Sequence, residues 1–472
     1  MKILLISPPS VRIQGNISGV YPLPNLGLAY IAATLEKNNF DVKILDIPAL
    51  RIQIKDLPGF LDGYTVYGIS CNIFNLNSGI EIAGIIKDRN PLSKVVIGGR
   101  CTAFPSETLL KKFSNVDFLI RGEGEEAMLD LCRALKENSQ INFIKGVSYR
   151  NGGSIIENPP GDPIDLDKLP FPARHLLPNK RYRMHPPFGI YPPTTIIETS
   201  RGCGYGCIFC SLPREVRERS VDRVIEDIQD VVEKLGIKEV HFIDPNFTYN
   251  QNRIIELCNR IIKKNIRIHW SCKTRVDLVS EELLKVMAKA GCYMISFGLE
   301  SGSQKILDIL NKKIKIQDTE NAFKLCKKAN IRTLAYTLLG SPGETRDTIE
   351  QTLRLVEKVD PDFVLYGELL PDPSSPLVKK AIEEKVMDFD KLIDFYVDNK
   401  NNHSLFDKNN IYNVSTEDIG SFIRYANARF YLRVRYIFKR LLLLRNVNEI
   451  IIMIKGVIFL LRDKIKKSYT VS

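Results

Sequence analysis

The chain has 472 residues, of which 44% are hydrophobic, 26% charged and 9% aromatic. This composition excludes a wholly disordered, collagen-like or mucin-like protein. The net charge is +12, and the segment from Ser421 to Ser472 accounts for +10 of it, with twelve basic residues against two acidic ones. A charge confined to one end argues against a nucleic-acid surface over the whole body and predicts an anionic partner for that segment.

No secretory or membrane-spanning segment is expected. The apolar run Ile3 to Ile6 ends at two prolines without a cleavage site, so it does not read as a signal peptide. The stretch Ile450 to Leu461 is interrupted by Lys455 and is shorter than the ~20 residues that a membrane span needs. Ten cysteines in such a chain are typical of reduced cytosolic thiols, so we expect a cytoplasmic protein.

Residues 1–158 alternate short β-branched runs with helical periodicity. We expect strands at 2–7, 42–46, 65–70, 94–98 and 117–121, with helices at 26–37, 77–87, 106–113 and 125–135. The alternation predicts an α/β fold with a doubly wound, Rossmann-like parallel sheet and a ligand crevice beyond the carboxyl ends of its strands. The loops at those ends contribute the candidate ligand-facing residues Ser70, Cys71, Gly98, Gly99, Gly122 and Glu123.

Residues 159–193 contain ten of the 25 prolines, which predicts a linker without long helices or central strands. Alternation then resumes, with strands expected at 194–199, 239–243, 267–271, 293–298, 333–339 and 363–368. Six strand–helix units predict a partial (β/α)6 barrel over 194–380, with its chemistry at the carboxyl ends of the strands. Residues 381–472 are expected to form a mainly helical, basic domain.

Directly after the first barrel strand, Cys203, Cys207 and Cys210 form a CxxxCxxC motif in a glycine-rich loop. Three thiols at this spacing can bind one iron–sulfur cluster and leave its fourth metal position open for a ligand. A structural zinc ion, the main metal alternative, wants four protein ligands, and the sequence offers no second CxxC or histidine pair. Buried core thiols fit poorly, because the glycines between the cysteines make a loop.

The motif, with Phe209 before its last cysteine, resembles that of the radical S-adenosylmethionine (SAM) superfamily. The resemblance implies a 4Fe-4S cluster on the three cysteines, with SAM bound to the open iron. Later strand ends resemble the SAM contacts of the family. They imply cofactor-binding roles for Phe209, for Asp244 and Asn246 at the amino group, for Arg275 at the carboxylate, for Glu300 and Ser301 at the ribose, and for Leu339 and Gly340 beside the adenine. A salt bridge at the barrel rim is the alternative role of Arg275.

The first domain resembles the cobalamin-binding domain of class B radical SAM methyltransferases and of the anaerobic Mg-protoporphyrin cyclase. The similar strings are 24–30, 96–99, 117–125 and 166–174, and both resemblances together cover about the first 380 residues. They imply cobalamin in the crevice of the first sheet, without a histidine ligand. The alternative is a domain that has kept the fold and lost the cofactor.

Together the resemblances imply an anaerobic enzyme that methylates an unactivated carbon of an apolar substrate, such as a lipid, an isoprenoid or a tetrapyrrole. SAM cleavage would generate the radical, cobalamin would deliver the methyl group, and flavodoxin or ferredoxin would supply electrons. Two alternatives stay open: a non-methylating radical SAM cyclase, oxidoreductase or carbon–carbon coupling enzyme, and a non-catalytic sensor. The sequence identifies no catalytic general base.

The segment after Ser421 interleaves basic residues with Tyr, Phe and Leu. One interpretation is a packed helical cap with a solvated basic face. The other is a peripheral contact with an anionic membrane, or a cover over an apolar, anionic substrate. Nucleic acid is the less favoured partner.

Overall fold

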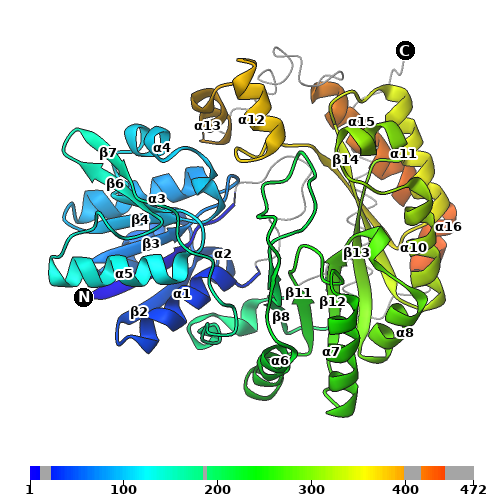
Figure 1. Ribbon diagram of the computed structural model, residues 1–472, viewed down its shortest axis with the longest axis horizontal. Helices are drawn as coiled ribbons and strands as arrows, with labels where there is room; N and C mark the ends of the chain where they lie inside the picture. Colours follow the sequence, from blue (N-terminus) through cyan, green and yellow to red (C-terminus); the bar gives the residue numbers. More distant parts are fainter. Residues whose placement is uncertain (11–22, 184–188, 398–415, 442–472) are drawn as a thin grey trace.

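The computed structural model describes residues 1–10, 23–183, 189–397 and 416–441, and two sheets with their own helices form its framework (Figure 1). The first sheet has the strand order β2-β1-β3-β4-β5-β6-β7. Its parallel strands are β1 (Lys2–Ser7), β2 (Asp41–Asp46), β3 (Val66–Ser70), β4 (Lys94–Gly98) and β5 (Phe118–Ile120), with α1 (Leu26–Lys37), α2 (Ile47–Leu50), α3 (Leu76–Arg89), α4 (Ser106–Lys112) and α5 (Gly124–Glu137) between or after them. The predicted doubly wound α/β fold is confirmed.

Two further strands extend this sheet in the antiparallel sense. They are β6 (Val147–Asn151), which pairs with β5, and β7 (Ser154–Glu157), which pairs with β6. The two strands are joined at Gly152 and Gly153, and Gly152 has a φ of +59°. A short glycine turn between β-branched runs is a hairpin signal that the sequence contains and that our prediction did not use.

The second sheet is parallel throughout, with the order β15-β14-β13-β12-β11-β8. Its strands are β8 (Thr194–Ile197), β11 (Glu239–Phe242), β12 (His269–Thr274), β13 (Cys292–Glu300), β14 (Arg332–Leu339) and β15 (Phe363–Glu368). The helices are α6 (Val221–Leu235), α7 (Gln251–Lys263), α8 (Glu281–Lys289), α9 (Gln304–Ile309), α10 (Ile316–Lys328) and α11 (Arg346–Val359). β15 and β8 do not pair with each other, so the barrel is partial, as predicted.

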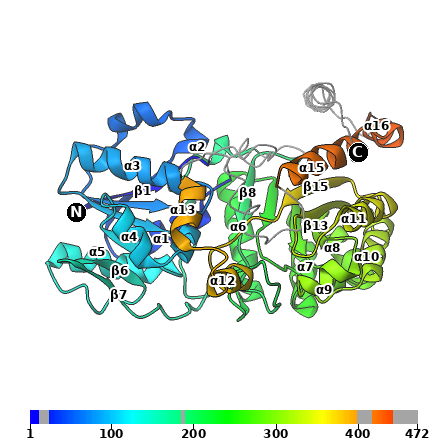
Figure 2. The same ribbon diagram turned by 90° about the horizontal axis from the view of Figure 1, so that it is seen from above.

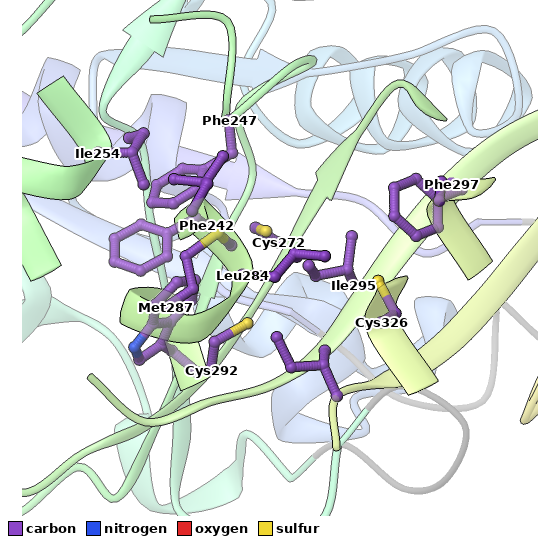
Figure 3. Close-up of a cluster of buried hydrophobic side chains, with 14 of the residues drawn as sticks. Phe242, Phe247, Ile254, Cys272, Leu284, Met287, Cys292, Ile295, Phe297 and Cys326 are labelled. Carbon is purple, nitrogen blue, oxygen red and sulfur yellow. The ribbon is translucent and has the colours of Figure 1, made fainter. Parts of the chain in front are cut away.

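One face of this second sheet packs against its helices. Alternate residues of the strands, such as Phe242, Cys272 and Ile295, lie with Leu284 and Met287 of α8 in a common apolar core (Figure 3). The intervening residues of each strand point to the opposite side, because successive strand residues alternate. We call that opposite side the inner face of the barrel.

The helices after β15 divide between the two sheets. α12 (Pro376–Glu383) and α13 (Phe389–Val397) pack with the first sheet, and Figure 2 shows α13 alongside the helices of that sheet. The same apolar core includes Ile306 and Leu369 of the barrel, so the two sheets share buried residues. Among the described residues, the segment predicted to form a separate helical domain from 381 onward has no core of its own. The predicted domain boundaries themselves stay predictions.

α15 (Thr416–Tyr431) runs beside β15, the outermost strand of the barrel, and α16 (Val434–Leu441) follows it. The Tyr431 hydroxyl accepts a hydrogen bond from the Val364 amide (3.1 Å) and donates to the Val364 carbonyl (2.6 Å). Tyr436 donates to the Asp362 carbonyl at 3.1 Å. The helices therefore bind the edge strand through both apolar packing and main-chain hydrogen bonds.

Part of the basic C-terminal segment is neutralised by the barrel. Arg429 pairs with Glu350 and Glu357 of α11, each at 2.7 Å, and Arg433 pairs with Asp360 at 3.0 Å. These arginines fit the packed-cap interpretation and are not available to an anionic surface. The basic residues beyond 441 lie outside the described residues. No helix in the described part of the chain is long and apolar enough to cross a membrane.

Candidate functional site

The cysteine loop, residues 201–211, follows β8 and is held in shape by main-chain contacts. Gly202 has a φ of +91°, and a Cβ atom there would lie 1.8 Å from the Glu215 carbonyl oxygen, so only glycine fits. The Cys203 amide donates to the Pro213 carbonyl at 2.7 Å, and the Asn311 side chain donates to the Gly206 carbonyl at 2.7 Å. The loop is therefore shaped by the protein itself.

The three cysteine side chains differ in burial: Cys207 is buried, whereas Cys203 and Cys210 are partly exposed. Burial raises the pKa of both Cys207 and Cys210. Among the described residues, no three His, Cys, Asp or Glu side chains converge closely enough to hold a single metal ion. In an iron–sulfur cluster each thiolate binds its own iron, so the three sulfurs need not converge on one point.

Two polar residues after β11 support the loop. Asn246 donates from Nδ2 to Cys203 Sγ at 3.1 Å, a contact that would modulate the electronics of a cluster sulfur. Asp244 is 1% exposed and accepts hydrogen bonds from the Thr199 amide (3.1 Å), Thr199 Oγ1 (2.8 Å) and Ser200 Oγ (2.5 Å). Asp244 therefore secures the start of the cysteine loop through these hydrogen bonds, and its contact with SAM stays a prediction.

Arg275 lies at the end of β12 and is 3% exposed. Its guanidinium pairs with Asp277 at 2.9 Å, donates to the Lys312 carbonyl at 2.8 Å, and stacks 3.6 Å from the ring centre of Tyr205 in the cysteine loop. In the structure Arg275 therefore forms a salt bridge with Asp277, which is the role that we named as the alternative to SAM binding. Through this contact with Tyr205, Arg275 also supports the cysteine loop.

Glu300 ends β13 in a conformation that side chains rarely adopt, with a φ of +60°. Its Oε1 lies 2.6 Å from Lys312 Nζ, and both side chains are nearly buried. A Cβ atom on Gly298 would lie 2.3 Å from Glu300 Oε1, so glycine at 298 leaves room for this ion pair. Strained backbone of this kind clusters at ligand sites. Ser301 is fully buried and its hydroxyl lies 3.2 Å from that of Thr352, so it faces α11.

The turn after β14 holds buried polar atoms that lack a partner. Leu339 is fully buried in an apolar cluster with Ile349 and Ile419, so its side chain does not face a ligand. Glu344 Oε2 accepts from the amides of Gly340 (2.5 Å) and Ser341 (3.1 Å). Glu344 Oε1 and Ser341 Oγ have no hydrogen-bond partner among the described residues. Burial raises the pKa of Glu344 to about 7. Such orphaned atoms at a strand end fit a polar cofactor.

The carboxyl ends of β3, β4 and β5 carry small, partly exposed residues, as predicted for a crevice: Ser70, Gly98 and Gly122. Gly122 has a φ of +79° and open space where a Cβ would lie. At Gly99 a Cβ would meet the Cys71 carbonyl oxygen at 2.5 Å, so this glycine permits close packing of two loops. The backbone at these strand ends is accessible to a large cofactor. The described histidines, His175, His241 and His269, lie on other elements, away from these strand ends in the sequence.

Cys71, which we predicted to line a cofactor, has a buried side chain, and its contact with a cofactor stays a prediction. Cys71 is 2% exposed and belongs to the apolar core of the first sheet. Its sulfur packs so closely on α3 that a Cβ on Gly79 would lie 2.2 Å away. Burial and a hydrogen bond with Cys101 raise the pKa of its thiol. Phe209 is partly buried and packs against the same core.

Glu123 joins the first domain to the start of the cysteine loop. It pairs with Arg217 and, at 3.2 Å, with Arg201, which also pairs with Glu125 at 2.7 Å. Although burial opposes it, the pKa of Glu123 is lowered by Arg217, the Ile164 amide and Arg201. We call Glu123, Glu125, Arg201 and Arg217 the amino-terminal clasp. The ion pairs of this clasp engage the carboxylate of Glu123, which we had predicted to bind a cofactor.

A second contact joins the first domain to the end of the loop. Arg100, after β4, donates from Nη2 to Ser211 Oγ at 2.6 Å and lies 3.3 Å from Asp372. Ser211 in turn donates to Asp372 at 2.6 Å. We call Arg100, Ser211 and Asp372 the carboxyl-terminal clasp. Sequence reasoning missed both clasps, since nothing in the local pattern links Arg201 to Glu125, 76 residues away.

Comparison with known proteins agrees with this geometry. The radical SAM superfamily matches residues 197–356, and the B12-binding domain family matches residues 16–132. An uncharacterized methyltransferase of Pyrococcus horikoshii, PH0819, is 31% identical over 93% of this chain and 94% of its own length. The anaerobic magnesium-protoporphyrin IX monomethyl ester cyclase of Rubrivivax gelatinosus is 29% identical over 83% of this chain and 72% of its own length.

Among solved structures, the radical SAM methyltransferase TsrM of Kitasatospora setae, with cobalamin and a 4Fe-4S cluster bound, superposes with a TM-score of 0.67. It is 20% identical, and the match covers 81% of this chain and 75% of TsrM, which supports the shared fold. The expected 4Fe-4S cluster, SAM and cobalamin are the cofactors of these two domain families. The chain therefore belongs to the cobalamin-binding radical SAM enzymes.

Proposed function

We propose that the chain is a C-methyltransferase that methylates an unactivated carbon of an apolar molecule. The observation that carries the proposal is an apolar wall on the inner face of β13, β14 and β15. Its buried residues are Met294, Leu334 and Phe363, near the amino-terminal ends of these strands, and the partly exposed Tyr336 and Leu365 cover them. An apolar wall can hold a hydrocarbon against the barrel and keep water away from a radical site. The PH0819 relative, a methyltransferase by name, supports the same reaction class.

Cys203, Cys207 and Cys210 would bind the cluster in this proposal, with Asn246 hydrogen-bonded to one sulfur. The rim of the barrel would bind SAM through Glu300, Gly340, Ser341 and Glu344, whose polar atoms lie at neighbouring strand ends. When bound, the cluster and SAM supply a carbon-centred radical that removes a hydrogen atom. Arg275 and Asp244 would keep the loop in position. A reductant such as flavodoxin or ferredoxin would deliver the electron.

Cobalamin would lie on the ends of β3, β4 and β5, against Ser70, Gly98, Gly99 and Gly122, without a histidine ligand. The support for this placement is the small size and open backbone of these residues. The protein would contribute a defined distance between the two cofactors, because the clasps join the first domain to the cysteine loop. We expect the purified protein to show the absorbance of cobalamin lacking its lower-axial base.

The test is the mass of the product. After anaerobic reconstitution with cobalamin, SAM and a reductant, extracts of apolar metabolites are incubated with SAM that carries a deuterated methyl group. The proposal expects a product heavier than its precursor by one labelled methyl group. SAM cleavage without any labelled product would contradict it.

A second candidate function is oxidation or cyclisation without methylation, favoured by the relative named as a cyclase at 29% identity. Such a reaction transfers no methyl group, so its product would carry no deuterium from the labelled SAM. The same mass measurement therefore separates the two functions.

We also propose that the basic residues beyond 441 contact an anionic membrane. Each basic residue near an anionic surface contributes about 1 kcal/mol, and the attraction weakens as salt rises. Co-sedimentation with anionic vesicles, with neutral vesicles and duplex DNA in parallel, tests this. Pelleting with anionic vesicles alone is expected. Equal, negligible pelleting with both vesicle types would leave the packed cap as the only role of the segment.

A further inference from the structure

Lys273 is a cation on the inner face of the barrel that no acid of the described residues pairs with. Trp270 and Cys272, at alternate positions of the same strand, pack into the outer core, where Figure 3 shows Cys272 beside Leu284 of α8. Strand alternation therefore directs Lys273, like Ser271, to the inner face. In the sheet register Lys273 lies opposite Ser296 of β13, whose next neighbour is Leu334 of β14.

The acids around this face are already engaged. Glu239 accepts hydrogen bonds from the Tyr191 amide, Thr194 and Tyr293, and Asp244 accepts those of Thr199 and Ser200. Glu300 pairs with Lys312, and Glu198 pairs with Arg201. Lys273 makes no hydrogen bond or ion pair with these groups. Its side chain is solvent-exposed, so it faces open space on the inner face, although the protein atoms around its amine lower the pKa of Lys273 through desolvation.

Two polar side chains on the inner face beside Lys273 carry no charge. The buried His241 has its Nδ1 engaged with Ser271, and its Nε2 has no hydrogen-bond partner among the described residues and lies 3.6 Å from Glu239. Burial and the charge of Lys273 lower the pKa of His241 to about 3, so the imidazole stays neutral. The Tyr336 hydroxyl is hydrogen-bonded to Ser296. Lys273 therefore lies among hydroxyls and a neutral ring, and the acid of this face, Glu239, is held by its own hydrogen bonds, which leaves the amine available to an anion.

We propose that Lys273 binds an anionic group, a carboxylate or a phosphate, of the substrate, whose apolar remainder lies on Tyr336 and Leu365, the partly exposed residues that cover Met294, Leu334 and Phe363. This inference rests on the proposed function and narrows its substrate class to an apolar molecule that carries an acid. A lysine that faces the inside of the barrel without an acidic partner can form a charge-assisted hydrogen bond with a ligand that supplies the counter-charge. The carboxylate of SAM is the other anion present, and the test separates the two sources.

The test uses the full chain reconstituted anaerobically with iron, sulfide and cobalamin. Equilibrium dialysis measures the binding of SAM alone and then, at saturating SAM, of octanoate and of octanol, which share one apolar chain. We expect octanoate to bind about 10- to 100-fold more tightly than octanol, as a hydrogen bond to a charged group implies. Lys273→Met should abolish that preference and leave octanol binding unchanged, while Lys273→Arg should retain it. Lys324→Met, on the exposed side of α10, is the matched control.

Two results would overturn the proposal. Equal binding of octanoate and octanol by the unmodified protein would show that the inner face does not recognise an acid. A Lys273→Met protein that binds SAM more than threefold less tightly would assign the amine to the SAM carboxylate. Iron content and circular dichroism check that the variants are folded. Because the readout is binding, an enzyme that binds octanoate through Lys273 but yields no methylated product would refute the proposed function and not this site.

Discussion

The cysteine loop is attached to the first domain at both ends, but by two different kinds of contact. The amino-terminal clasp is largely buried: Arg201 is 15% exposed and pairs with three acids, one of them 5% exposed. The carboxyl-terminal clasp lies near the surface, where Arg100 is 55% exposed and holds Ser211 through a single guanidinium nitrogen. Buried ion networks lose much when one partner is removed, whereas exposed pairs contribute little. The loop is therefore firmly attached at its start and loosely at its end.

The largest effect should follow from removing the three cysteines of the loop that lies between the two clasps. Replacing Cys203, Cys207 and Cys210 together by Ala removes every thiolate that can hold the cluster, so we expect complete loss of bound iron and of SAM cleavage. Iron analysis and detection of 5′-deoxyadenosine measure both. Cys132→Ala, a buried thiol of α5, is the control and should retain full iron content. Iron unchanged in the triple variant would refute the cluster assignment.

Breaking the buried clasp should cost stability. Arg201→Met leaves Glu123, Glu125 and Glu198 without their shared cation, and we expect a loss of about 3 kcal/mol in the free energy of unfolding. Urea unfolding under anaerobic conditions measures it. Arg214→Met, at an exposed position of the segment that follows the loop, is the matched control and should change stability little. If the two variants unfold alike, the amino-terminal clasp is not a source of stability.

Glu344 is a buried acid whose carboxylate is bound by main-chain amides, whereas Glu125 of the amino-terminal clasp pairs with an arginine. Glu344 has a pKa raised to about 7 by burial, against an ordinary value of 4.5. A raised pKa means that the folded state binds the proton more tightly, so this stabilisation is present below pH 4.5 and is lost as the pH rises through 7. We expect Glu344→Gln to flatten the decline in unfolding free energy between pH 5.5 and 8.5, by up to about 2 kcal/mol. An unchanged pH profile would contradict the raised pKa.

The smallest stability effect should come from the exposed clasp. Arg100→Ala removes one solvent-accessible guanidinium, and we expect a loss of about 1 kcal/mol or less. Because Ser211 directly follows Cys210, the same variant should broaden the electron paramagnetic resonance signal of the reduced cluster. A stability loss as large as that of Arg201→Met would show that the two clasps are equivalent, against the comparison above.

Much of the fold could be predicted because strand alternation and helical periodicity are local patterns. The ends of β13 and β14, for example, lie where the apolar runs stop at Glu300 and Leu339. The orientation of the site residues could not be predicted in the same way. Asp244 and Arg275 do follow their strands, yet each is bonded to protein groups that come from other parts of the chain. Such partners are chosen by tertiary packing, which a motif does not contain.

The cysteine motif was the most informative local signal, since its three thiols and glycines lie within eight residues. The surroundings of individual side chains in the first domain could be predicted less well from the sequence. Ser70, Gly98 and Gly122 lie at the carboxyl ends of their strands and are at least partly exposed, whereas Cys71 packs in the core and Glu123 pairs with Arg217. Whether each remaining candidate touches SAM or cobalamin stays a prediction.

The pairing of Tyr431 with Val364 has a consequence for the oligomeric behaviour of the chain. An unpaired outermost strand offers its amides and carbonyls to any other strand and so favours edge-to-edge association. The Tyr431 hydroxyl bonds both the amide and the carbonyl of Val364, as a neighbouring strand would. The ion pair of Arg429 with Glu357 holds α15, which carries Tyr431, in place. The C-terminal helix thus protects the open barrel from self-association, and a chain truncated before Thr416 should aggregate through β15.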